Sequence, residues 1–210
     1  AGIKNYIKEA KKNKLKIYSF CDDYYIKNYL GNKKTLNYAL NIIKRLKLLK
    51  IKKYIIPLYG KSFLNKKNKQ NAIKNISHIG KICIKYKIEL LLESNMSPKK
   101  FFEIKKKILH KNCFFLFDTG NRVTLKRNFQ KDINNFGKYI KHIHLKDKNK
   151  LKKNVIIGKG LVNFNLLFSN LKKINYKGSF SIESQRGYDI LKQAGKNYLF
   201  FKKLVNKYKL

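Results

Sequence analysis

Carboxylates are scarce in this sequence, and three of them stand directly after apolar, strand-like runs. The 210 residues contain 11 Asp and Glu against 51 Lys and Arg. Glu93 ends the run IELLLE, Asp118 ends CFFLFD and Glu183 ends SFSIE, while His144 lies near the end of a fourth run, KHIHLKD. Carboxylate and imidazole donors together form a mixed oxygen and nitrogen set that suits a divalent ion. The pattern predicts a metal centre if the fold brings these four positions together.

Each of these residues also has a simpler interpretation when it is taken alone. A carboxylate at the end of a strand is commonly the N-cap of the following helix. A single His within an apolar strand is commonly a hydrogen-bonded core residue. We favour the metal centre because four consecutive strands each supply one metal-type ligand at the same end, in a chain with so few acids.

The elements that must position these residues alternate between apolar strands and amphipathic helices. Residues 35–49 illustrate the helical pattern, since Ala39, Ile42, Ile43 and Leu46 recur at steps of three and four. Short β-branched and aromatic runs between the helices predict strands. We expect strands at 15–20, 53–58, 88–92, 113–117, 140–145 and 179–182, and helices at 2–14, 35–49, 71–86, 98–109, 127–137, 164–174 and 190–208.

This order predicts an α/β fold with a parallel sheet. We expect strands this apolar to be buried on both faces, as in parallel sheets. No GxGxxG motif follows the first strand, which weakens a doubly wound dinucleotide-binding fold. In a (β/α)₈ TIM barrel all strands end at the same mouth, where catalytic residues gather. We therefore expect a partial TIM barrel with six βα units, forming a single domain over 1–210.

Several longer motifs resemble one known family. IELLLES, FDTGN, IKHIHLKDK, IIGKGLVNF and YKGSFSIES occur in the order in which similar motifs occur in the sugar phosphate isomerase/epimerase group of the xylose isomerase-like TIM barrel superfamily. The segments GIKNYIKEAKKNKLKIYSFCDDYY and KYIIPLYGKS resemble the third and fourth strands of that family. The resemblance covers nearly the whole chain and implies that it holds strands three to eight, with the first two strands missing.

The resemblance implies a specific chemistry for the strand-end residues. Glu93, Asp118, His144 and Glu183 would be the metal ligands, with Mn²⁺ as the first choice of ion and Mg²⁺, Co²⁺ or Zn²⁺ as alternatives. Glu93 and Glu183 would also be the catalytic acid/base pair of a sugar (phosphate) isomerase or epimerase. One Glu would remove the proton alpha to a ketose carbonyl, the other would return a proton from the opposite face, and the metal would stabilise the enediolate.

Four further positions are candidates for substrate binding. Asn121 stands where ketose 3-epimerases often have a substrate-binding His. His142 lies two residues before the proposed ligand His, and it could equally be a packing residue. Lys146 could contact a hydroxyl or a phosphate. Arg186, three residues after Glu183, could bind an anionic group.

Other features of the same strand ends admit two interpretations each. Gly158 and Gly160 could cradle a phosphate or form a simple turn. Asp22 and Asp23 could bind substrate or cap the following segment. The three cysteines, which are widely spaced and lie within apolar runs, are expected to be buried free thiols of a reducing compartment, at Cys21, Cys83 and Cys113.

The net charge of +40 would ordinarily suggest a nucleic-acid partner. However, only four of the cations are Arg, and the Lys residues are spread along the whole chain rather than gathered in one patch. We interpret the charge as compositional drift in a lysine-rich cytoplasmic enzyme. The expected partner is a small sugar or sugar phosphate, with no nucleic acid and no membrane, and the sequence leaves open a homo-oligomer.

Two alternatives use the same fold. An enzyme of the endonuclease IV kind needs additional His ligands for a three-metal cluster, and beyond His142 and His144 the chain offers only His78 and His110, which lie in or near predicted helices. An inactive or truncated barrel fragment is the second alternative. Dehydratases of the same superfamily also remain open, because they use the same ligands.

Overall fold

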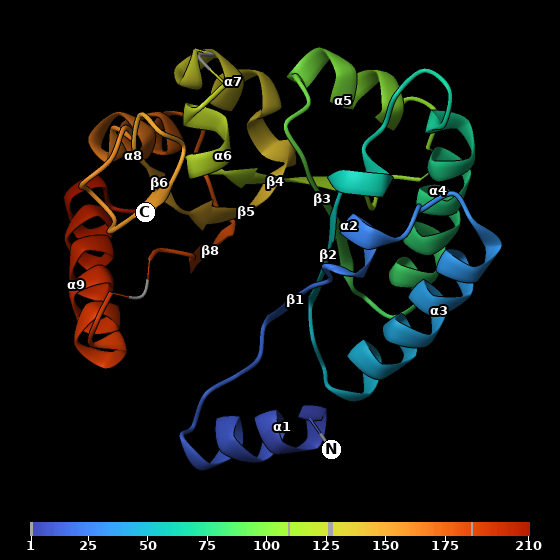
Figure 1. Cartoon of the computed structure of the whole chain (residues 1–210), viewed down its shortest axis with the longest axis horizontal. Helices are drawn as coiled ribbons and strands as arrows, with labels where there is room; N and C mark the ends of the chain where they lie inside the picture. The colour runs from blue at the N-terminus through green and yellow to red at the C-terminus, as the bar shows by residue number, and fades with distance from the viewer. Residues whose placement is uncertain (1, 109, 126–127, 186) are drawn as a thin grey trace. The chain divides into compact units, whose positions relative to one another are not determined.

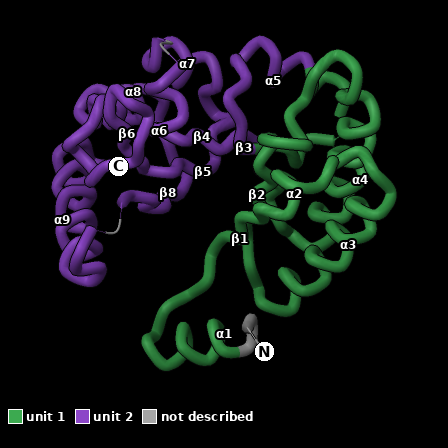
Figure 2. Tube along the Cα trace, in the orientation of Figure 1, with its two compact units in different colours: residues 1–92, 104–113 green, residues 93–103, 114–210 purple. Residues whose placement is uncertain are grey.

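The structure is a computed structural model, and the chain forms two compact units, which Figure 2 colours separately. No helix in the described part of the chain has the length and apolarity to cross a bilayer. The single-domain assignment stays a prediction. The units comprise residues 1–92 with 104–113, and 93–103 with 114–210. The described residues are 2–108, 110–125, 128–185 and 187–210 (Figure 1).

The first unit packs helices against strands in the order β1-β2-β3. β1 and β2 are parallel, with Ser19 opposite Lys53, and β2 is buried along its whole length. The predicted apolar face of the helix at 35–49 is confirmed, since Ala39, Ile42 and Ile43 are buried. The elements are α1 (Gly2–Lys12), β1 (Ser19–Cys21), α2 (Tyr24–Lys27), α3 (Lys33–Leu48), β2 (Lys53–Pro57), η1 (Gly60–Ser62), α4 (Lys69–Lys85) and β3 (Glu89–Glu93), whose last residue belongs to the second unit.

The second unit holds the strands β4, β5 and β8 in parallel register. Asp118 lies opposite His144 across β4 and β5, and His144 lies opposite Ser181 across β5 and β8. The backbone N–H of Glu183 continues this ladder by donating to the carbonyl of Leu145 at 3.0 Å. The elements are α5 (Pro98–Lys105, mostly in this unit), β4 (Phe114–Asp118), α6 (Thr119–Val123), α7 (Phe129–Phe136), η2 (Gly137–Tyr139), β5 (Ile140–Leu145), β6 (Asp147–Lys148), β7 (Asn154–Val155), α8 (Phe164–Lys173), β8 (Ser179–Ile182) and α9 (Ile190–Tyr208).

Alternate residues of β5 and β8 face either the helices or the other side of the sheet. On the helix side, Phe180 of β8 stacks on Phe168 of α8, with ring centroids 5.6 Å apart. On the other side, His142 of β5 meets the hydroxyls of Ser179 and Ser181. Aromatic burial therefore holds the helices in place, while the opposite face of the sheet carries polar side chains.

The predicted elements agree with the structure where the apolar pattern is strongest. The strands expected at 140–145 and 179–182 are confirmed as β5 and β8. The strand expected at 15–20 is wrong over most of its length, because β1 begins at Ser19 and Leu15 is 69% exposed. The expectation of a buried Cys21 is also wrong, since this residue ends the short β1 and is exposed, whereas Cys83 and Cys113 are buried.

The loop that follows β5 is organised around one buried carboxylate. Asp147 is fully buried, and it accepts hydrogen bonds from the backbone N–H groups of Lys148, Gly158, Gly160 and Val162 at 2.8–3.0 Å. Because these amides already bind an internal anion, the interpretation of Gly158 and Gly160 as a phosphate cradle is wrong.

The Gly160→Ala variant tests this packing. A Cβ at Gly160 would lie 2.3 Å from Oδ1 of Asp147 and 2.6 Å from the carbonyl oxygen of Lys148. We expect the free energy of unfolding to fall by about 1–3 kcal/mol, as for other overpacked sites, when it is measured by urea unfolding. Gly195→Ala, at an exposed position on α9, is the control, because a Cβ there meets nothing within 4 Å, and it should stabilise the helix by about 0.5–1 kcal/mol. Equal stabilities of the two variants would contradict the prediction.

Candidate metal centre

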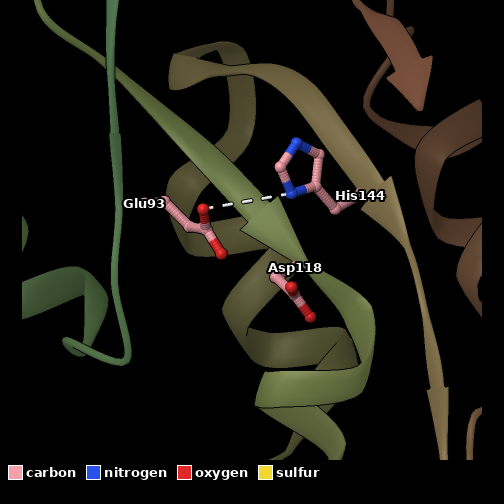
Figure 3. A group of neighbouring side chains, drawn as sticks. All are labelled: Glu93, Asp118 and His144. Atoms are coloured by element: carbon pink, nitrogen blue, oxygen red, sulfur yellow. Dashed lines mark ion pairs between the residues drawn. The ribbon is translucent and has the colours of Figure 1, made fainter. Parts of the chain in front are cut away.

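Three of the predicted ligands form one compact buried group. Glu93 ends β3, Asp118 ends β4, and His144 is the next-to-last residue of β5. One ligand atom of each lies within 4.8 Å of the others (Figure 3). The three residues are only 2–6% exposed. Parallel strand ends thus bring together residues that are far apart in the sequence.

Glu183, the fourth predicted ligand, contacts this group through the imidazole. Its Oε1 lies 3.0 Å from Nδ1 of His144, and the same Nδ1 lies 4.0 Å from Oε2 of Glu93. The side chain of Glu183 is 38% exposed, whereas that of Glu93 is 8% exposed. Glu183 is therefore the ligand candidate that is most open to solvent.

The donor set fits a divalent cation. Nδ1 of His144 is buried and makes no hydrogen bond of regular geometry within the described residues. A buried polar atom without such a partner is costly, and a metal ion held together with the neighbouring carboxylates would satisfy it. Burial lowers the pKa of His144, against the opposing effect of Glu183 and Asp118, so near neutral pH the ring is in the neutral form that binds metals.

Asp118 performs the N-cap role as well as facing the centre. Its Oδ1 accepts from the backbone N–H of Asn121 at 2.7 Å and so caps α6. Its Oδ2 lies 3.0 Å from the ammonium of Lys146. The N-cap and metal-ligand interpretations of Asp118 are therefore compatible, because Oδ1 caps the helix and Oδ2 faces the centre.

Thr119 joins the start of α6 to the end of β5. Its hydroxyl oxygen accepts from the backbone N–H of Lys146 at 2.9 Å, and it also lies within hydrogen-bond distance of the carbonyls of His144 and Lys146. These bonds fix the backbone on either side of Leu145, so the side chains of His144 and Lys146 keep a defined position relative to Asp118.

Arg122 is a buried residue that the sequence did not single out for a role near the centre. Its guanidinium donates to the carboxylate of Asp132 and to the carbonyl of Met96, at 3.1 Å from Nη1. It also lies 5.1 Å from the ring centroids of Phe117 and Phe136. Arg122 thus connects α6 and α7 to the segment that follows Glu93. Its rarity in a lysine-rich chain was the one sequence signal that could have indicated a special environment.

The predicted substrate-binding residues have distinct surroundings. The side-chain oxygen of Asn121 accepts from Lys148 at 2.8 Å. Both ring nitrogens of His142 lie within 2.8 Å of serine hydroxyls, which favours the packing interpretation over a substrate contact. Lys146 lies among the carboxylates of the centre. Arg186 falls outside the described residues.

Asp22 in the first unit is a buried network residue. It accepts from the backbone N–H of Tyr24 at 3.1 Å at the start of α2, and from the hydroxyls of Tyr54 and Tyr38 at 3.1 and 3.3 Å. Burial raises the pKa of Asp22, although these hydrogen bonds oppose the effect. These contacts favour the capping interpretation of Asp22.

A cavity of about 460 Å³ adjoins Glu183. Most of its polar lining residues carry neutral amides or hydroxyls, and Lys146 and Glu183 are its charged lining residues within the described part of the chain. Gln193 donates to Asn197 at 2.8 Å, and Asn197 donates to Ser184. The lining residues are Lys146, Asn154, Ile182, Glu183, Ser184, Gln185, Ile190, Gln193, Ala194 and Asn197.

The family model of the xylose isomerase-like TIM barrel matches residues 2–204 of this chain. The chain belongs to that family. The predicted fold class is confirmed by this match and by solved structures. No curated protein matches the sequence.

The similar solved structures are TIM-barrel relatives at low sequence identity. A xylose isomerase domain protein from Planctomyces limnophilus has a TM-score of 0.83 at 13% identity, covering 98% of this chain and 83% of that one. A D-tagatose 3-epimerase-like protein has a TM-score of 0.81 at 23% identity, covering 99% and 83%. A family protein from Mycobacterium smegmatis in complex with magnesium has a TM-score of 0.78 at 17% identity, covering 98% and 78%.

The lowered pKa of His144 predicts a pH dependence of stability. The unfolded state takes up a proton near the ordinary His pKa of about 6.5, and the folded state does so only at lower pH. The free energy of unfolding of the ion-free protein should therefore fall as the pH drops below about 6.5, by at most about 1.4 kcal/mol per pH unit from this residue.

Urea unfolding in a chelator at about pH 7.5 and about pH 5.5 measures this effect. His144→Gln should lose less stability than the wild type between the two values. His78→Gln on α4, where the side chain is exposed, should keep the wild-type difference. An unchanged difference in His144→Gln would contradict the prediction.

The burial of Arg122 predicts a large loss of stability in Arg122→Met. The variant leaves the carboxylate of Asp132, which is 7% exposed, without its guanidinium partner. Breaking a buried ion pair from one side typically costs about 3–5 kcal/mol. Arg45→Met, at an exposed position on α3, should change the urea midpoint little. A loss below about 1 kcal/mol in Arg122→Met would show that the pair is not structurally important.

Proposed function

We propose that the chain is a divalent-metal-dependent isomerase or epimerase of a small sugar, acting by proton transfer at the carbon alpha to a ketose carbonyl. One observation carries the proposal: the carboxylate of Glu93, which ends β3, and that of Glu183, which directly follows β8, approach the same imidazole nitrogen of His144, at 4.0 and 3.0 Å. Two-base proton transfer requires two carboxylates near one substrate carbon, and these two carboxylates lie beside a common metal-type ligand. Family membership and epimerase-like neighbours support it.

The chain's own residues would divide the work between binding and proton transfer. Glu93, Asp118, His144 and Glu183 would hold the ion, with Mn²⁺ as our first choice. When bound, the ion would supply Lewis acidity toward the carbonyl and hydroxyl oxygens of the substrate. One Glu would accept the alpha proton on a carboxylate oxygen and the other would return a proton to the opposite face. The burial of Glu93 limits competing solvation of its carboxylate, whereas Glu183 is more open to solvent.

The cavity beside Glu183 supports a sugar as the substrate. Amide and hydroxyl groups of Asn154, Ser184, Gln193 and Asn197 can donate to and accept from sugar hydroxyls. The backbone amides of the glycine loop already bind Asp147, so they support no phosphate site. The proposed substrate is a sugar or a sugar phosphate, with no phosphate held by that loop. A cytoplasmic location and a homo-oligomer stay predictions.

The endonuclease-like alternative is not favoured. Among the described residues, the metal-type cluster contains Glu93, Asp118 and His144. His78 lies on α4 and His110 near Cys113, and neither belongs to this cluster. Neither His therefore supplies the additional ligands that a three-metal cluster needs.

Deuterium exchange tests the proposed chemistry directly. With Mn²⁺ and D-tagatose in deuterated water, the wild type should place deuterium at the carbon alpha to the carbonyl, as followed by NMR. Glu183→Gln should lower the exchange rate by at least about 100-fold, because it removes a general base. The control is Glu103→Gln, at an exposed position on α5, which should keep the wild-type rate.

Two outcomes would contradict the assignment. Exchange that persists in Glu183→Gln would remove the role of this residue. Absence of exchange in the wild type across a set of free ketoses and ketose phosphates would favour the inactive-fragment alternative.

A further inference from the structure

We propose that Lys146 is the internal counter-ion of the metal centre: its ammonium holds the ligand carboxylates together in the ion-free protein and weakens the binding of the divalent ion by charge repulsion. This inference rests on the proposed metal dependence. It assigns Lys146 a role within the centre itself, whereas the sequence suggested a substrate contact.

The ammonium of Lys146 lies between two of the proposed ligands. Nζ is 3.0 Å from Oδ2 of Asp118 and 2.6 Å from Oε2 of Glu183. The Lys146 side chain is 15% exposed and that of Asp118 is 2% exposed, so the contact between them is only weakly screened by solvent. A cation in this position links the buried Asp118 to the more exposed Glu183.

The backbone and the aliphatic stem of Lys146 are also held by contacts. Its backbone N–H donates to the hydroxyl of Thr119 at 2.9 Å. Its stem lies against Gly120, where a Cβ would approach Cγ of Lys146 to 2.8 Å. Contacts at the backbone, stem and head distinguish Lys146 from a solvated surface lysine, whose head is free to move.

The charges around Lys146 match a divalent ion. Glu93, Asp118 and Glu183 contribute three negative charges, and the ammonium of Lys146 offsets one of them. The two charges that remain are balanced by one divalent cation. Without Lys146 the same carboxylates would carry three uncompensated charges, which destabilises the ion-free protein and strengthens the attraction for any cation.

The Lys146→Met variant keeps most of the stem and removes the charge. In a chelator its thermal midpoint should fall below that of the wild type, because the carboxylates repel one another. Its Kd for Mn²⁺, measured by calorimetry on the full chain, should be about tenfold lower than that of the wild type. The increase in affinity for Tb³⁺ should be larger than the increase in affinity for Mn²⁺, because the repulsion that the variant removes scales with the charge of the ion.

Two further variants serve as controls. Lys146→Arg keeps the positive charge and should restore a Kd within about threefold of the wild type. Lys131→Met removes one Lys charge at an exposed position on α7 and should leave the Kd for both ions unchanged. The pair separates a local counter-ion effect from a change in net charge.

Clear outcomes overturn the proposal. A Kd for Mn²⁺ in Lys146→Met that is unchanged or higher would show that Lys146 only supports the structure. If the variant is unfolded without ions, Mn²⁺ should restore its circular dichroism, because the ion replaces the ammonium; a variant that stays unfolded in Mn²⁺ contradicts the proposal. If the wild type binds neither Mn²⁺, Mg²⁺ nor Zn²⁺, the proposed function fails instead, and the ion-free midpoints still test the counter-ion role.

Discussion

The parallel register of β4, β5 and β8 is the constraint on which the candidate site depends. Hydrogen bonding places Asp118 opposite His144, and His144 opposite Ser181, with Glu183 following in the same ladder. A slip by one residue in any of these strands would turn a metal-type side chain toward the helices. Aromatic packing on the helix side, such as Phe180 on Phe168, opposes such a slip because it would place polar residues in an apolar layer.

The strand ends were predictable from the sequence because their signal is local. A strand-like run followed by an acid identifies Glu93, Asp118 and Glu183 without knowledge of the fold, and parallel topology then brings them to one edge. The helix at 35–49 was predictable for the same reason, since its periodic apolar face is local too.

The contacts that organise the site were not predictable in the same way. The partners of Arg122, at Asp132 and Met96, and the two carboxylates around Lys146 depend on where separate segments meet. At the short strand β1 the local sequence pattern predicted more strand than the structure contains. Residues 15–18 have strand-like composition, but they remain largely exposed and the strand begins at Ser19, because strand propensity depends on packing against neighbours.

Asp147 has a consequence for how the loop between β5 and α8 takes part in binding. By accepting from four backbone amides, this carboxylate orders the loop during folding, so the associated loss of conformational entropy belongs to folding and not to ligand capture. A preorganised loop offers the ligand a constant shape and little induced fit. The backbone of the loop then keeps one conformation, and differences in affinity among ligands must arise from the side chains that the loop carries.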